Sequence, residues 1–86
     1  MELERDRFGW HAVKLPKWRF HDDVLVDWSL SIVERPHYCD RGRFIVYVEA
    51  PTIDGADGFP RYYFDWDRML AELEAWIAGR EELKHA

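Results

Sequence analysis

Three chemically active side chains lie within four residues near the middle of the chain. His37, Cys39 and Asp40 offer an imidazole, a thiol and a carboxylate, with Tyr38 among them. Such groups could bind a metal ion or support a thiolate nucleophile. A closed zinc site would need two more Cys or His ligands, however, and the sequence contains no CxxC or HxxxH pair. We therefore interpret the segment as a polar loop and predict no catalytic residue, no metal site and no cofactor.

Two acidic segments could also ligate a cation. The first is 21–23, His-Asp-Asp, but neighbouring residues of a strand point to opposite faces and neighbouring residues of a helix diverge by about 100°. The second, 54–58, is Asp-Gly-Ala-Asp-Gly, in which Ala56 and Gly58 stand where a calcium loop needs oxygen ligands. Both segments are more simply interpreted as turns.

Two clusters combine cationic and aromatic side chains. The first cluster comprises Lys14, Lys17 and Arg19 with Trp10, Trp18 and Phe20, and the second, in a predicted hairpin loop, comprises Arg35, His37, Tyr38, Arg41 and Arg43. Such mixtures can grip phosphates and stack on bases. They are also typical of the central residues of protein interfaces, and of core aromatic residues beside cations that reach solvent. We predict that the second cluster is exposed and contacts a partner.

The charges are distributed unevenly along the chain. The net charge is -5, and residues 44–86 hold the whole acidic excess, because residues 1–43 are balanced. An acidic total makes free nucleic acid the less favoured partner, since phosphate binding requires many cationic contacts. A basic protein surface is the better complement, and Glu72 and Glu74 on the predicted helix are candidate contacts for it.

Composition describes a single small globular domain, residues 1–86, with 48% hydrophobic and 34% charged residues. The single cysteine excludes an internal disulfide framework, which is consistent with a reducing compartment. The charged first residues and the lack of a long apolar run predict a cytoplasmic protein that does not enter a membrane. The sequence leaves open whether the protein forms a homodimer. The 16% aromatic content is high for a chain of this size, which predicts aromatic side chains at the surface.

Apolar and polar residues alternate in four segments, which predicts strands near 8–13, 24–34, 43–50 and 59–64. One face of the second segment carries Val24, Val26, Trp28, Leu30 and Ile32, and one face of the third carries Phe44, Val46 and Val48. From residue 65 the period changes to three and four residues, in Trp66, Met69, Leu70, Leu73, Trp76 and Ile77. The predicted fold is α+β: a small antiparallel sheet of three to four strands with one C-terminal amphipathic helix packed on one face.

The run Phe59-Pro60-Arg61-Tyr62-Tyr63-Phe64-Asp65-Trp66-Asp67-Arg68, followed by a short Glu-rich helix, resembles small accessory proteins encoded by phages and prophages. The resemblance covers about a third of the sequence and includes no catalytic motif. Many such proteins bind and disable host machinery, and small acidic ones include anti-CRISPR proteins that block nucleic-acid-binding surfaces of defence complexes. The resemblance implies a function of that class and transfers no residue.

Together these observations predict a non-enzymatic binding protein that occupies a partner's basic surface, as a phage-encoded inhibitor would. In this hypothesis, acids on the helix meet the basic patch and aromatic residues supply the centre of the contact. The alternative hypothesis is a small nucleic-acid-binding or regulatory module that uses the basic and aromatic 35–43 loop. The third hypothesis is that the protein is an enzyme.

Overall fold

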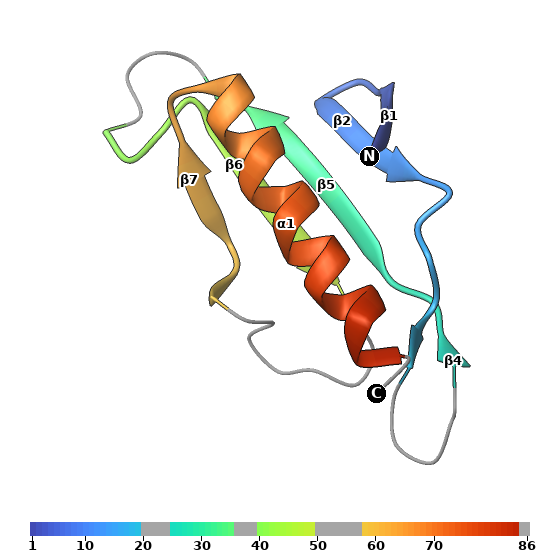
Figure 1. Ribbon diagram of the computed structural model, residues 1–86. Helices are drawn as coiled ribbons and strands as arrows, with labels where there is room; N and C mark the ends of the chain where they lie inside the picture. The colour runs from blue at the N-terminus through green and yellow to red at the C-terminus, as the bar shows by residue number, and fades with distance from the viewer. Residues whose placement is uncertain (20–24, 36–39, 50–57, 85–86) are drawn as a thin grey trace.

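The computed structural model describes residues 1–19, 25–35, 40–49 and 58–84 (Figure 1). They form an antiparallel sheet of five strands in the order β1-β2-β5-β6-β7, a small two-stranded sheet, β3-β4, and one helix, α1. The elements are β1 (Glu2–Arg5), β2 (Gly9–Val13), β3 (Trp18–Arg19), β4 (Leu25–Val26), β5 (Ser29–Glu34), β6 (Phe44–Glu49), β7 (Arg61–Tyr63) and α1 (Trp66–Lys84). The α+β class is confirmed, whereas the prediction of three to four strands was wrong.

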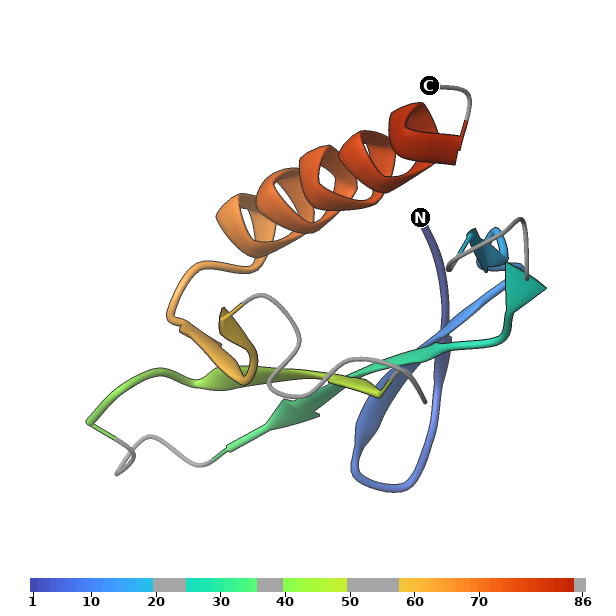
Figure 2. The ribbon, with the colours of Figure 1, turned by 90° about the horizontal axis from the view of Figure 1, so that it is seen from below.

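β5 and β6 form the centre of the main sheet. Their antiparallel register pairs Leu30 with Val48 and Ile32 with Val46, so the apolar members of both strands share one face. This is the alternation that the sequence predicted for Leu30, Ile32, Phe44, Val46 and Val48. α1 crosses this face of the sheet in Figure 1, and Figure 2 shows the sheet and the helix as two separate layers.

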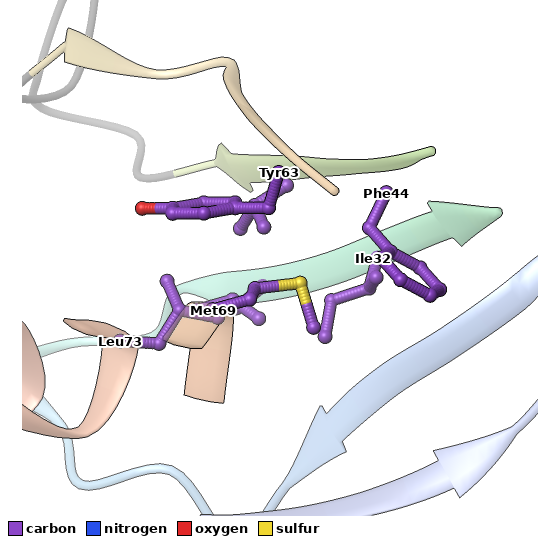
Figure 3. Close-up of a cluster of buried hydrophobic side chains, with 7 residues drawn as sticks. Ile32, Phe44, Tyr63, Met69 and Leu73 are labelled. Carbon is purple, nitrogen blue, oxygen red and sulfur yellow. The ribbon is translucent and has the colours of Figure 1, made fainter. Parts of the chain in front are cut away.

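The core lies between these two layers. Met69 and Leu73 of α1 are 0% exposed, and Leu30, Ile32 and Val46 beneath them are at most 1% exposed. Phe44 and Tyr63 complete the buried cluster, and Figure 3 shows the Tyr63 ring near Leu73 and Met69 and the Phe44 ring near Ile32. The predicted helix stripe therefore faces the sheet through its central members, while Trp66 and Leu70 pack at the margin of the cluster.

The predicted strand over 24–34 is interrupted. β4 ends at Val26 and pairs with β3 in the small sheet, whereas β5 begins at Ser29 in the main sheet. Between them, the indole N–H of Trp28 donates a hydrogen bond of 2.6 Å to the carbonyl of Pro16. Trp28 is thus fixed to the segment before β3, which explains the break. Val24 lies outside the described residues.

Two strands were not predicted. β1 has one apolar residue, Leu3, among Glu2, Glu4 and Arg5, so it lacks the alternation of a half-buried strand. β1 pairs only with β2, with Leu3 opposite Ala12, and such charged sequences are common on sheet edges. β3 has only two residues, too few for a recognisable pattern.

α1 is longer than the stripe over 65–78 predicted, because it continues through Gly79 to Lys84. Gly79 is exposed, and a side chain there would meet no atom within 4 Å. Glycine inside a helix costs about 1 kcal/mol relative to alanine, and α1 tolerates that cost here. In the part of the chain that the structure describes, no helix is long and apolar enough to cross a membrane.

Candidate interaction surfaces

In the first aromatic and cationic cluster, Trp10 packs against the core. The ring of Trp10 lies 4.6 Å from the ring of Trp66 and 6.2 Å from that of Phe44, measured between centroids. Two of the cations turn outward: Lys14 Nζ lies 3.3 Å from a carboxylate oxygen of Glu2, and Lys17 Nζ lies 3.9 Å from one of Asp27. The side chains of Trp18 and Arg19, and the whole of Phe20, lie outside the part of the chain that the structure describes. For Trp10, Lys14 and Lys17, the structure therefore supports the interpretation of a core ring beside solvated cations.

The second cluster lies where the connection from β5 returns to β6. Arg35, Arg41 and Arg43 are all exposed, and the N–H of Arg35 donates to the carbonyl of Arg43 at 2.6 Å. His37 and Tyr38, together with Cys39, lie outside the described residues, so the structure brings together only the three arginines of the predicted set. Arg43 is partly engaged already, because its guanidinium lies 3.7 Å from the carboxylate of Glu34.

Arg41 differs from Arg43 in its surroundings. Its guanidinium lies 5.8 Å from the centroid of the Tyr62 ring, close enough for a weak cation–π attraction. Neither Arg35 nor Arg41 has a carboxylate partner among the described residues. Within the part of the chain that the structure describes, the charges of these two arginines are therefore not offset by a carboxylate.

The sheet face opposite α1 forms a surface that was not predicted from the sequence. The register places Gly9, Val33, Ile45 and Tyr62 side by side in one row, and His11, Ser31 and Tyr47 in the next. We call these seven residues, with Glu49 at the end of β6, the open face. The tip of the β1–β2 hairpin also lies on this side of the sheet, away from α1 (Figure 2).

The open face is more apolar than a fully solvated sheet face needs to be. Tyr47 and Tyr62 are 38% and 37% exposed, and Ile45 between them is 4% exposed. A solvated antiparallel face usually carries polar residues at these alternate positions. The signal was present in the sequence, because Val33, Ile45 and Tyr47 occupy the positions between the core residues of β5 and β6. What the sequence did not show was that β7 would bring Tyr62 beside them.

The predicted acidic surface of α1 is divided in two. Glu72 and Glu74 are two residues apart, so they project about 200° apart around the helix, on either side of buried Leu73. Glu72 Oε2 accepts a hydrogen bond of 3.2 Å from Nε of Arg68, and Glu74 Oε1 lies 3.3 Å from the N-terminal ammonium of Met1. Both carboxylates remain substantially exposed, and surface pairs of this kind contribute only about 0–1 kcal/mol.

The outward side of α1 lies between those two acidic flanks. It carries Ala71, Ala75 and Ala78, all exposed and all small, with exposed Arg68 two turns before Ala75 on the same side. A partner surface could therefore approach the helix backbone closely between Glu72 and Glu74. Asp67, in the first turn, adds another exposed carboxylate at the start of the helix.

The turn between β1 and β2 is organised by Asp6. Its Oδ1 accepts hydrogen bonds from the N–H groups of Phe8, at 2.8 Å, and Gly9, at 2.9 Å. The hydrogen bond from Phe8 is the main reason that the pKa of Asp6 lies below its ordinary value, and contact with His11 acts in the same direction. A perturbed carboxylate can mark a functional site. Here the cause is a turn that Asp6 holds closed.

His11 contacts two carboxylates but does not form a metal site with them. Its Nδ1 lies 3.2 Å from Asp6, and its Nε2 lies 3.5 Å from Glu4. The two ring nitrogens point in different directions, so these carboxylates cannot share one ion with the ring. Within residues 1–19, 25–35, 40–49 and 58–84, no group of three or more His, Cys, Asp or Glu side chains could hold a metal ion.

No protein-family model, curated protein or solved structure matches this chain. The exposed surfaces of the protein are therefore the basis for proposing its function.

Proposed function

We propose that this protein is a non-enzymatic binding protein that occupies the basic surface of a protein partner. The observation that carries the proposal is the outward side of α1, where a strip of alanines lies between exposed carboxylates on both flanks. Opposite charges at an interface accelerate association and select the partner. The net charge of -5 extends the same preference to the whole molecule.

The internal ion pairs of the helix do not oppose this function. Glu72 and Glu74 each have a single cationic partner and remain exposed themselves, and such pairs are weak in water. A lysine or arginine of a partner can therefore replace Arg68 or the N-terminal ammonium at small cost. Asp67 has no cationic partner among the described residues, so it needs no such exchange.

In its most specific form, the proposal is a phage-encoded inhibitor that covers a nucleic-acid-binding surface of a host protein, such as a CRISPR defence complex. Surfaces that bind phosphate are rich in lysine and arginine. An acidic helix that occupies such a surface excludes nucleic acid by charge and by volume. The resemblance of the 59–68 segment to small phage accessory proteins supports this form.

The experiment compares two charge reversals. We expect the protein to capture a basic protein from a nuclease-treated bacterial lysate, and the double variant Asp67→Lys, Glu72→Lys to associate with that protein at least tenfold more slowly. The matched control is Asp27→Lys with Glu2→Lys, which changes the net charge equally at exposed acids outside α1. Equal losses for the two double variants would reject α1 as the contact surface, leaving only a general effect of net charge.

A second candidate is a nucleic-acid-binding module. It is favoured by Arg35 and Arg41, which have no carboxylate partner among the described residues, and by the Tyr62 ring beside Arg41. In this case the purified protein would shift a labelled oligonucleotide, and its affinity would fall steeply with salt. Micromolar oligonucleotide binding at physiological salt, lost in the Arg35→Ala, Arg41→Ala variant, would replace the inhibitor proposal with this one.

A further inference from the structure

The open face raises the question of what covers it. Val33, Ile45, Tyr47 and Tyr62 are contiguous in the register of β5, β6 and β7, and α1 lies on the other side of the sheet. Contiguous apolar surface rimmed by charge is typical of interaction sites. Two rings together with a cation that contacts one of them are characteristic of the energetic centre of a protein interface.

The charges of the open face are arranged along β6 in a definite order. Arg41, at Tyr62, lies where β6 begins, and Glu49 is the last residue of β6. Ile45 and Tyr47 lie between these two charges on the same face. Glu49 is exposed and, like Arg41, has no oppositely charged partner among the described residues. The face therefore presents a cation, an apolar centre and an anion in sequence.

We propose that the open face binds the open face of a second copy of this chain, in a twofold dimer whose two β6 strands run antiparallel. This arrangement brings Arg41 of one copy to the Glu49 end of the other, twice. It also places the Ile45 side chains of the two copies against each other at the axis, since Ile45 is four residues from both Arg41 and Glu49. A twofold axis requires a surface to be complementary to itself, and a patch with opposite charges at its two ends meets that requirement.

Other ways to pair two copies are less favourable. If the β6 strands ran parallel, Arg41 would face Arg41 and Glu49 would face Glu49. Edge-to-edge pairing of two β1 strands, in a register that keeps the faces continuous, would oppose Glu2 with Glu4 or Glu4 with itself. Charged edge strands commonly prevent such pairing. The face is thus favoured over the β1 edge, and the antiparallel orientation over the parallel one.

The size of the face limits the expected affinity. The open face spans four strands, β2, β5, β6 and β7, which at about 4.8 Å spacing and with six residues along β5 and β6 give a surface of about 19 by 20 Å. Two such faces together bury on the order of 800 Å2, which is the size of a weak interface. We therefore expect a weak dimer, with a dissociation constant on the order of 100 μM. Both α1 helices would lie on its outer sides, where their carboxylates stay accessible.

Sedimentation equilibrium of the purified protein tests the dimer. We expect the apparent mass to rise from 10.4 kDa toward twice that value with concentration. Tyr47→Lys should weaken association at least tenfold, because it introduces one cation from each copy into the apolar centre. Phe64→Lys is the matched control, since Phe64 is 67% exposed in the turn that leads from β7 to α1. A mass that stays at 10.4 kDa up to millimolar concentration overturns the proposal, whether or not another protein or an oligonucleotide binds the face.

A charge exchange tests the orientation. Arg41→Glu and Glu49→Arg should each weaken dimerisation about tenfold, because each brings like charges together at both ends of the interface. The double variant exchanges the two charges and should return to within about threefold of the original dissociation constant. Both residues are exposed, so the folded monomer should tolerate the changes. Additive losses in the double variant would contradict the antiparallel arrangement.

Discussion

The two faces of the five-stranded sheet come from the same strands but have different surroundings. On the face toward α1, Ile32 and Val46 are at most 1% exposed beneath Leu73. On the open face, Tyr47 and Tyr62 are 38% and 37% exposed, although they lie only one residue along the strand from Val46 and Tyr63. Because successive side chains point to opposite faces, one alternating pattern produces both a core and an aromatic outer surface.

This difference shows why burial and apolar character must be considered separately. The face toward α1, which we call the covered face, is apolar because α1 packs against it. Without Leu30, Ile32 and Val46, α1 would have little to pack against. On the open face, Ile45 is already buried in the monomer at 4% exposure, whereas the rings of Tyr47 and Tyr62 remain exposed. These two exposed rings are better explained by contact with another molecule than by the stability of the monomer.

The largest effect is expected in the covered face. Leu73→Ala removes a side chain that is 0% exposed and leaves a cavity between α1 and the sheet, so it should lower the free energy of unfolding by about 2 to 5 kcal/mol. Urea denaturation of the variant and the original protein measures the difference. A loss below about 0.5 kcal/mol would mean that Leu73 is a surface residue and that the two layers do not pack as described.

A glycine of the open face should be almost as sensitive, for a different reason. A Cβ atom at Gly9 would overlap the backbone carbonyl of Ile32 on the neighbouring strand. Gly9→Ala should therefore force β2 away from β5 and cost about 2 to 3 kcal/mol in the same denaturation experiment. Gly79→Ala provides the contrast, because a side chain there meets open space and favours the helix. Similar results for the two variants would contradict the pairing of β2 with β5.

The exposed ring of the open face should contribute little to monomer stability. Tyr47→Ser, measured at concentrations where the protein is monomeric, should cost less than about 1 kcal/mol because the ring is already partly solvated. Tyr63→Ser, at 9% exposure on the covered face, is the comparison and should cost several times more. Equal losses of stability for Tyr47→Ser and Tyr63→Ser would contradict the distinction between the two faces.

The smallest effect is expected for the turn between β1 and β2, which lies on the same side of the sheet as the open face. The pKa of Asp6 is lower in the folded chain than in the unfolded chain, chiefly because of the Phe8 N–H. Its contribution to stability is thus present above the unfolded pKa and is lost as the pH falls through the folded value. Asp6→Asn should remove this part of the acid dependence, as seen by comparing unfolding curves between neutral and acidic pH. Identical pH profiles for the two proteins would show that the turn does not depend on the Asp6 charge.

The strong periodicities allowed much of the fold to be predicted from the sequence. The stripe containing Met69 and Leu73 and the alternation in β5 and β6 each define a buried side, so the helix, two strands and their packing followed. β1 was missed because its charges carry no such pattern. The break before β5 was missed because it depends on a distant contact, from the Trp28 indole to Pro16.

The candidate surfaces were less predictable than the fold. Arg41 and Arg43 were identified as exposed from composition alone, but their neighbours Tyr62 and Glu34 come from other strands. The sequence predicts Glu72 and Glu74 as contacts for one basic surface, whereas the helix geometry places them on opposite flanks of α1. A linear sequence shows which residues could make contact, whereas the sheet register decides which of them lie together.

The central claim is that the open face is an intermolecular surface and the covered face is the core of the monomer. Aromatic ring signals in a carbon–proton NMR spectrum test it directly, recorded while the protein is diluted from about 1 mM to about 10 μM, a range that brackets a dissociation constant on the order of 100 μM. We expect the signals of Tyr47 and Tyr62 to move with dilution while that of Tyr63 stays fixed. Signals of Tyr47 and Tyr62 that do not change over this range would contradict it.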